Sequence, residues 1–201
     1  MKIMKTKILL YLSLILALGA CYPGGADYYS DLDVTYTNYD DEFDFASLRT
    51  YAMPDSIVKV EGDLAEGEEP EIVKEPYNTQ MLTRISSNME ALGWTRIDNP
   101  EEADLVLFPA AWTNTTVYYW YDYWCWYWYY YCGWGWGYPT VSTYTTGTLV
   151  MALIADGEDY IDPTHVWTGA VNGLLAGSYN STRVNNAIDQ AFAQSPYLKT
   201  N

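Results

Sequence analysis

The sequence predicts an α+β fold: a single small domain over residues 33–197, with a mixed or antiparallel sheet packed by about two helices and a long aromatic-rich loop or hairpin. Three observations predict it. Short segments alternate bulky and polar residues as strands do, and other segments repeat apolar residues at helical spacing. One helical segment falls among the strands and another follows them. With 201 residues, 49% of them hydrophobic, the chain is long enough to bury one core.

Five segments have the pattern of strands: 34–39, 45–53, 105–108, 145–155 and 165–175. The first alternates β-formers with smaller polar residues, which is typical of a half-buried strand. The run Leu105-Val106-Leu107-Phe108 is continuously apolar, which predicts a strand that is buried on both faces and interrupted at Pro109. We expect the last two strands to be joined by the acidic turn Asp156-Gly157-Glu158-Asp159.

Two helices are predicted from apolar residues that recur every three or four positions. The first ends at Gly93 and has its apolar face at Tyr77, Met81, Ile85, Met89 and Leu92. The second is capped by Ser181 or Thr182 and stops before Pro196. Its apolar face comprises Val184, Ile188, Ala191 and Phe192.

Between the second strand and the first helix, residues 59–76 are rich in Glu, Gly and Pro. This composition predicts a solvated acidic loop, with cation binding as the alternative.

The charge balance excludes one large class of function. The chain has 26 acidic and 10 basic residues, a net charge of −16, whereas nucleic-acid binding requires Lys and Arg against phosphates. The single histidine, His165, allows no two-histidine metal motif, and an orienting or packing role fits it better than catalysis. We therefore expect no cofactor, no metal and no catalytic residues.

The first twenty residues have the layout of a lipoprotein signal peptide. Three lysines precede a short apolar run that ends in Leu18-Gly19-Ala20-Cys21, which resembles a lipobox. Cleavage before Cys21 and acylation, for example with palmitate, would anchor the protein in a lipid bilayer. Residues 21–32 then form a flexible tether. Tyr22 rather than Asp follows the cysteine, and by resemblance to lipoprotein sorting signals this favours an anchor in the outer membrane. No acidic cluster directly follows Cys21, so we expect the protein to face the periplasm rather than the cell surface. The alternative is an ordinary secretory signal with a chance cysteine.

The most unusual feature is the aromatic segment, residues 118–138, in which 15 of 21 residues are Tyr or Trp. Rings at consecutive positions make both faces of any strand aromatic, so at least one face needs a cover other than water. Four covers compete: a protein partner or second copy, a glycan, lipid head groups, or the chain's own sheet beneath a hairpin. The candidate binding residues are Trp120, Tyr123, Trp124, Trp126, Tyr127, Trp128, Tyr130, Trp134 and Trp136.

Two further cysteines, Cys125 and Cys132, lie in the same segment. In an oxidising envelope an even pair suggests a disulfide that closes a small loop. Two reduced thiols are the alternative, and zinc is disfavoured because the chain lacks the other ligands of a four-ligand site.

Several fragments together resemble a known family. In order they are Asp44 to Ala52, Leu92-Gly93-Trp94, Ala103-Asp104-Leu105, Gly147-Thr148-Leu149-Val150, Val166-Trp167-Thr168-Gly169, and a terminal helix that ends near Ser195-Pro196. Behind a lipobox they resemble the envelope lipoproteins of the domain-of-unknown-function family numbered four-one-three-six. The resemblance implies a fold and an envelope location, and no established activity. It also implies an aspartate in the strand after Gly-Thr-Leu, where this chain has Ala152.

These observations favour a non-enzymatic binding or structural module of the cell envelope that contacts a protein partner through its Tyr/Trp-rich surface. The alternative is a carbohydrate- or peptidoglycan-binding module, and behind it a glycan-active hydrolase. No feature of the sequence selects the two carboxylates that such a hydrolase needs.

Overall fold

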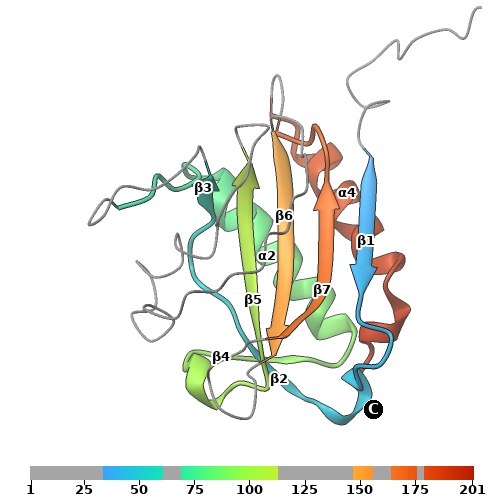
Figure 1. Ribbon diagram of the computed structural model, residues 1–201. Helices are drawn as coiled ribbons and strands as arrows, with labels where there is room; N and C mark the ends of the chain where they lie inside the picture. Colours follow the sequence, from blue (N-terminus) through green and yellow to red (C-terminus); the bar gives the residue numbers. More distant parts are fainter. Residues whose placement is uncertain (1–33, 61–68, 113–146, 156–163, 176–178) are drawn as a thin grey trace, which may run out of the picture.

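The computed structural model describes residues 34–60, 69–112, 147–155, 164–175 and 179–201. They form a mixed seven-stranded sheet with two α-helices behind it in the view of Figure 1. The predicted α+β class is confirmed.

Long antiparallel strands form the centre of the sheet, and short parallel strands extend it on one side. The strands are β1 (Thr35–Tyr39), β2 (Thr50–Ala52), β3 (Val58–Val60), β4 (Thr95–Ile97), β5 (Leu105–Trp112), β6 (Thr148–Ala155) and β7 (Thr164–Val171). Their order is β1-β7-β6-β5-β2-β4, and β3 also pairs with β5. The pairs β1–β7, β7–β6 and β6–β5 are antiparallel. The pairs β5–β2, β5–β3 and β2–β4 are parallel.

Strand β5 does not stop at Pro109, so the predicted interruption is wrong. Pro109 pairs with Met151 of β6 inside an eight-residue strand. On its other side, β5 pairs with β2 at Leu105 and Val106 and with β3 from Ala110 onward. Pro109 therefore lies where that ladder is interrupted, and a residue without a backbone N–H is tolerated there.

The two helices bury their predicted apolar faces, except that Tyr77 at the start of the first is 39% exposed and Leu92 at its end is only partly buried. Helix α2 (Tyr77–Ala91) buries Met81, Ile85 and Met89, and Gly93 follows its end with φ +98°. Helix α4 (Ser181–Ala193) buries all four residues of its predicted face. Its cap differs from the prediction: Asn180, not Ser181 or Thr182, accepts a hydrogen bond from the Arg183 N–H.

Three short 3-10 helices connect these elements: Phe45–Ser47, Pro100–Glu102 and Pro196–Leu198. The first of them occupies the start of the predicted strand 45–53, of which only β2 is extended. Asp44 favours the helical turn because its side chain accepts a hydrogen bond from the Ala46 N–H. At the other end of the chain, the predicted strand 165–175 ends at Val171 and turns at Gly173, which has φ +73°.

The described parts of the predicted acidic loop are tied to the sheet. Lys59 belongs to β3 and forms an ion pair with Glu71 (2.7 Å). Ile72 forms an isolated antiparallel bridge with Val58, and Val73 is buried in the core. The composition indicated solvation correctly for Glu71, which is exposed, but it concealed the two hydrophobic residues that follow.

The main core lies between the sheet and the helices. Alternate residues of the central strands, such as Leu107 of β5 and Leu153 of β6, contact the apolar faces of α2 and α4 there. Trp167 of β7 is fully buried in this core, and its ring packs against Phe192 of α4 with centroids 5.4 Å apart. The helices therefore cover one face of the sheet completely.

Candidate functional site

The residues predicted to carry function all lie outside the described residues. Cys21 belongs to residues 1–33, and Cys125, Cys132 and the nine candidate aromatic residues belong to residues 113–146. The structure does describe the two residues that flank the stretch 113–146, which contains the aromatic segment.

These two points, Trp112 and Gly147, form a stem at one end of the sheet. The Gly147 N–H donates to the Trp112 carbonyl oxygen (2.7 Å), and Gly147 has φ +86°. The Gly147 carbonyl in turn accepts from the Leu175 N–H (2.7 Å). Below the stem, β5 and β6 pair along seven consecutive positions, from Trp112 with Thr148 to Val106 with Ile154. The segment is thus inserted between two strands whose ends are held together.

The sheet face turned away from the helices is also apolar. Because side chains alternate along a strand, the residues between those of the main core point to this second face. Seven apolar residues there are at most 3% exposed: Val106, Phe108 and Ala110 of β5, Val150, Ala152 and Ile154 of β6, and Ala170 of β7. This face is turned toward the viewer in Figure 1, with the helices behind the sheet. Buried apolar residues on both faces agree with the prediction for 105–108.

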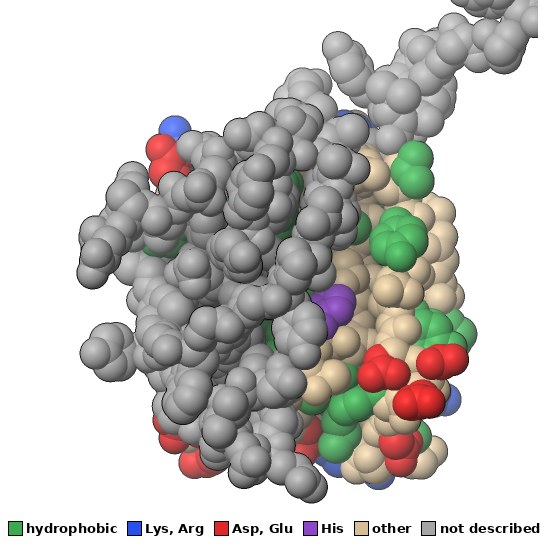
Figure 2. Space-filling model, in the orientation of Figure 1, with side chains coloured by type: hydrophobic (Ala, Val, Ile, Leu, Met, Phe, Trp, Pro, Cys, Tyr) green, Lys and Arg blue, Asp and Glu red, His purple; other side chains and the backbone are tan. Residues whose placement is uncertain are grey.

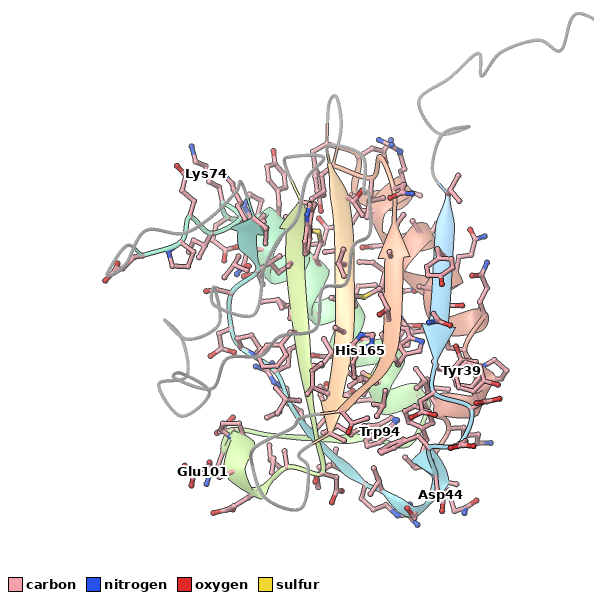
Figure 3. All side chains as sticks on the ribbon, viewed as in Figure 1. Tyr39, Asp44, Lys74, Trp94, Glu101 and His165 are labelled. Carbon is pink, nitrogen blue, oxygen red and sulfur yellow. The ribbon has the colours of Figure 1, made fainter. Side chains whose placement is uncertain are left out.

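A polar pair lies on β7 beside this apolar face. The His165 Nε2 and the Thr168 Oγ1 are 2.7 Å apart, and Figure 3 shows His165 over the central strands. Burial lowers the pKa of His165 from its ordinary value of 6.5, which favours a neutral imidazole at pH 7. Thr168 pairs across the sheet with Ala152, the position where the family resemblance implies an aspartate. The His165 ring is therefore hydrogen-bonded to a threonine of its own strand, and its cross-strand neighbour is Ile154.

Residues in the fragments that carry the family resemblance form hydrogen bonds between secondary-structure elements. Asp104 Oδ2 accepts hydrogen bonds from the Arg49 N–H (2.8 Å), the Thr50 N–H (2.8 Å) and the Thr50 hydroxyl (2.9 Å). Partial burial acts to raise the pKa of Asp104, but these three bonds lower it overall. The carboxylate thereby ties the start of β5 to the start of β2.

Two tryptophans make similar joints with the end of the chain. The Trp94 Nε1–H donates to the Leu198 carbonyl oxygen (2.7 Å), and the Trp167 Nε1–H donates to the Ser195 hydroxyl (2.9 Å). The Thr200 N–H donates to the Leu92 carbonyl oxygen (3.0 Å). Both indole N–H groups are thus satisfied within the fold, which is what buried tryptophans require.

Neither a metal site nor a membrane span is found in the part of the chain that the structure describes. No group of three or more His, Cys, Asp or Glu residues there could hold a metal ion. Within the same residues, no helix is long and apolar enough to cross a membrane.

Comparison with known families decides the identity of the domain. The family model "Domain of unknown function (DUF4136)" matches residues 35–197. The chain belongs to the DUF4136 family. The predicted resemblance is therefore confirmed, and the match covers every described element from β1 to the end of α4.

A solved structure of a member of this family agrees with the assignment. The chain is 28% identical to a DUF4136 family protein from Bacteroides thetaiotaomicron, with a TM-score of 0.64 and coverage of 83% of this chain and 97% of that one. It is also similar to two PelC dodecamers from Paraburkholderia phytofirmans. They are 11% and 12% identical, with TM-scores of 0.42 and 0.38, and the matches cover 84% of this chain and 98% and 99% of theirs. No curated protein matches the chain.

Proposed function

We propose that this DUF4136 protein is a lipid-anchored binding module of the cell envelope, without enzymatic activity, that holds a protein partner through its Tyr/Trp-rich segment. Acylated Cys21 attaches it to the outer membrane on the periplasmic side. The domain serves as the scaffold from which the segment is presented.

One observation carries the proposal: the segment is inserted where two paired strands are hydrogen-bonded to each other. Its ends are joined by the bond between the Gly147 N–H and the Trp112 carbonyl, above two fully paired strands. Binding loops commonly take this form, a variable segment on a scaffold that does not change shape. The composition supports the same reading, because Tyr and Trp are enriched at the centres of protein interfaces and charged residues are depleted there. Asp122 is the only charged residue from Thr113 to Thr146.

The partner is tested by co-purification of the full-length lipoprotein from native envelopes. We expect a protein to co-purify with the wild type and to be lost when Trp124, Trp126 and Trp128 are changed to alanine. Ile72→Ala, which removes an exposed apolar side chain from the described surface, is the control and should retain the partner.

Purified peptidoglycan and polysaccharides serve as the competing ligands in the same experiment. Retention of the wild type by a glycan, abolished by the triple tryptophan variant, would contradict the protein-partner proposal and establish the carbohydrate-binding alternative. Turnover of a glycan that depends on one particular Asp or Glu would contradict the absence of enzymatic activity.

The anchor is tested separately by metabolic labelling with radioactive palmitate. We expect label on the wild type and none on Cys21→Ala, and the variant should move from the membrane pellet to the soluble fraction. Unchanged labelling or unchanged sedimentation of Cys21→Ala would contradict the anchor.

A further inference from the structure

Strand β1 is an open edge of the sheet. Among the described strands it pairs only with β7, over five positions from Thr35 with Val171 to Tyr39 with Trp167. The Asp40 N–H donates to the Val166 carbonyl, and the Val34 carbonyl accepts from the Asn172 N–H. Because backbone groups alternate in an antiparallel ladder, those of the even-numbered residues face β7. The N–H and C=O groups of Thr35, Thr37 and Tyr39 consequently point away from the sheet.

This edge lacks the features that normally prevent strand addition. Exposed edge strands are commonly protected by lysine, proline or a bulge, and β1 (Thr-Tyr-Thr-Asn-Tyr) has none of them. The opposite edge, β4, has only three residues and carries Arg96, whose guanidinium bonds the Met53 carbonyl (2.7 Å) and Asp55 (2.6 Å). Of these two edges, β1 is therefore the one to which a further strand could be added.

Hydrophobic side chains are exposed along the same edge. Five large hydrophobic residues are exposed among the described residues, and three of them lie in or next to β1: Val34 (58%), Tyr36 (53%) and Tyr39 (41%). The Tyr39 ring is stacked on Tyr197 with centroids 3.6 Å apart, so one of its faces is already fixed by the fold. An added strand would therefore find both free backbone groups and apolar side chains.

Acidic residues lie at the end of β1, where Figure 2 shows acidic and hydrophobic side chains next to each other. They are Asp40, Asp41, Glu42 and Asp44. A second copy of the chain would bring the same negative charge to this edge, and the net charge of −16 opposes the pairing of two copies. A basic segment would instead be attracted at this end of the strand.

We infer that β1 is a docking edge for an extended, basic segment of a partner protein, which adds to the sheet as a further strand. Its backbone would bond Thr35, Thr37 and Tyr39, and its Lys or Arg residues would meet the acidic residues at the end of β1. Guanidinium or ammonium groups would also contact the exposed tyrosine rings. This contact goes beyond the proposed function and does not depend on the Tyr/Trp segment.

The test uses the full-length lipoprotein in detergent micelles and a synthetic peptide, Lys-Lys-Val-Thr-Val-Thr-Val-Lys-Lys, followed by isothermal titration calorimetry. We expect the peptide to bind, its glutamate counterpart not to bind, and methylation of alternate backbone amides to abolish binding. Tyr36→Lys should weaken binding by at least about tenfold, because it places a positive charge on the edge and leaves the backbone donors intact.

The controls separate this contact from the first proposal. Ile72→Lys adds the same charge at another exposed hydrophobic position and should leave the affinity unchanged. The triple alanine variant of Trp124, Trp126 and Trp128 should also bind the peptide normally. Equal binding of the lysine and glutamate peptides, or binding of neither, would overturn the inference. A dimer in sedimentation velocity that Tyr36→Lys dissociates would also overturn it and assign the edge to a second copy.

Discussion

Asp104 illustrates how one side chain holds two strands in register. A single carboxylate oxygen accepts three hydrogen bonds from Arg49 and Thr50, and the Asp104 N–H donates in return to the Thr50 hydroxyl (3.0 Å). A charged acceptor strengthens each bond. The residues on both sides of this contact belong to the fragments on which the family resemblance was recognised, so a structural role accounts for these residues.

We predict that Asp104→Ala lowers the free energy of unfolding by about 1 kcal/mol, because solvent partly replaces the lost bonds at this exposed position. Urea unfolding followed by circular dichroism measures the change. Asp98→Ala removes a nearby exposed carboxylate and should be close to neutral. Equal effects of the two variants would show that the joint contributes nothing.

Gly169 allows Trp167 to lie flat against β7. A Cβ atom at position 169 would lie 2.7 Å from the Trp167 Cη2 and 3.1 Å from the Met151 Cε. We predict that Gly169→Ala costs about 1–3 kcal/mol of stability through overpacking. Adding Trp167→Phe, which supplies a smaller ring, should recover part of the loss in a double-mutant cycle. Strict additivity of the two changes would refute the steric explanation.

At the scale of elements, the start of helix α4 offers three residues that could cap it. Asn180, Ser181 and Thr182 all suit the role by residue type, and the structure selects Asn180. We predict that Asn180→Ala lowers the unfolding free energy by about 1 kcal/mol, whereas Ser181→Ala leaves it nearly unchanged. Thermal unfolding of the two variants measures the difference. A larger loss in Ser181→Ala would place the cap one residue later.

Helices were more predictable than strands because their signal is local. The spacing of Met81, Ile85 and Met89 fixes one buried face whatever lies opposite it, and all three are buried. Strand limits depend on neighbours that are distant in the sequence. Pro109 is tolerated because β5 has no parallel pairing partner at that position. Val73 reaches the core next to Ile72, which forms a β-bridge with Val58 of β3. Neither pairing can be read from the residues alone.

At the scale of the whole molecule, stability should fall with acid in two stages. Burial lowers the pKa of His165 below its unfolded value of 6.5, so protonation favours the unfolded chain. Its contribution is complete above pH 6.5 and is lost as the pH falls through the lowered folded pKa. Hydrogen bonds from Arg84 lower the pKa of Asp189 below 3.8. That contribution, like the one from Asp104, persists above pH 3.8 and is lost only in stronger acid.

His165→Gln should remove the first stage and keep the second, because glutamine does not titrate. Urea unfolding at a series of pH values from 7.5 to 3 measures both stages in the wild type and the variant. An unchanged slope between pH 7 and pH 5 in His165→Gln would show that another group is responsible.

The candidate surfaces differ in how far the sequence predicts them. Composition alone singles out the Tyr/Trp segment, because 15 rings in 21 residues exceed what a small core absorbs. The β1 edge could not be predicted, since the alternation at Thr35–Tyr39 indicates a strand but not its position in the sheet. The partnership of His165 with Thr168 likewise depends on the irregularity at Leu153/Ile154, which places both side chains on the second face.

The closed stem at Trp112 and Gly147 has a consequence for protein engineering. Because β5 and β6 are already hydrogen-bonded at Trp112 and Gly147, the domain should tolerate replacement of residues 113–146 by segments of other lengths and compositions. Lengthening a flexible loop twofold costs only about 0.6 kcal/mol in closure entropy. A variant with a tight turn in place of residues 113–146 should therefore keep the fold and could display grafted peptides at this end of the sheet.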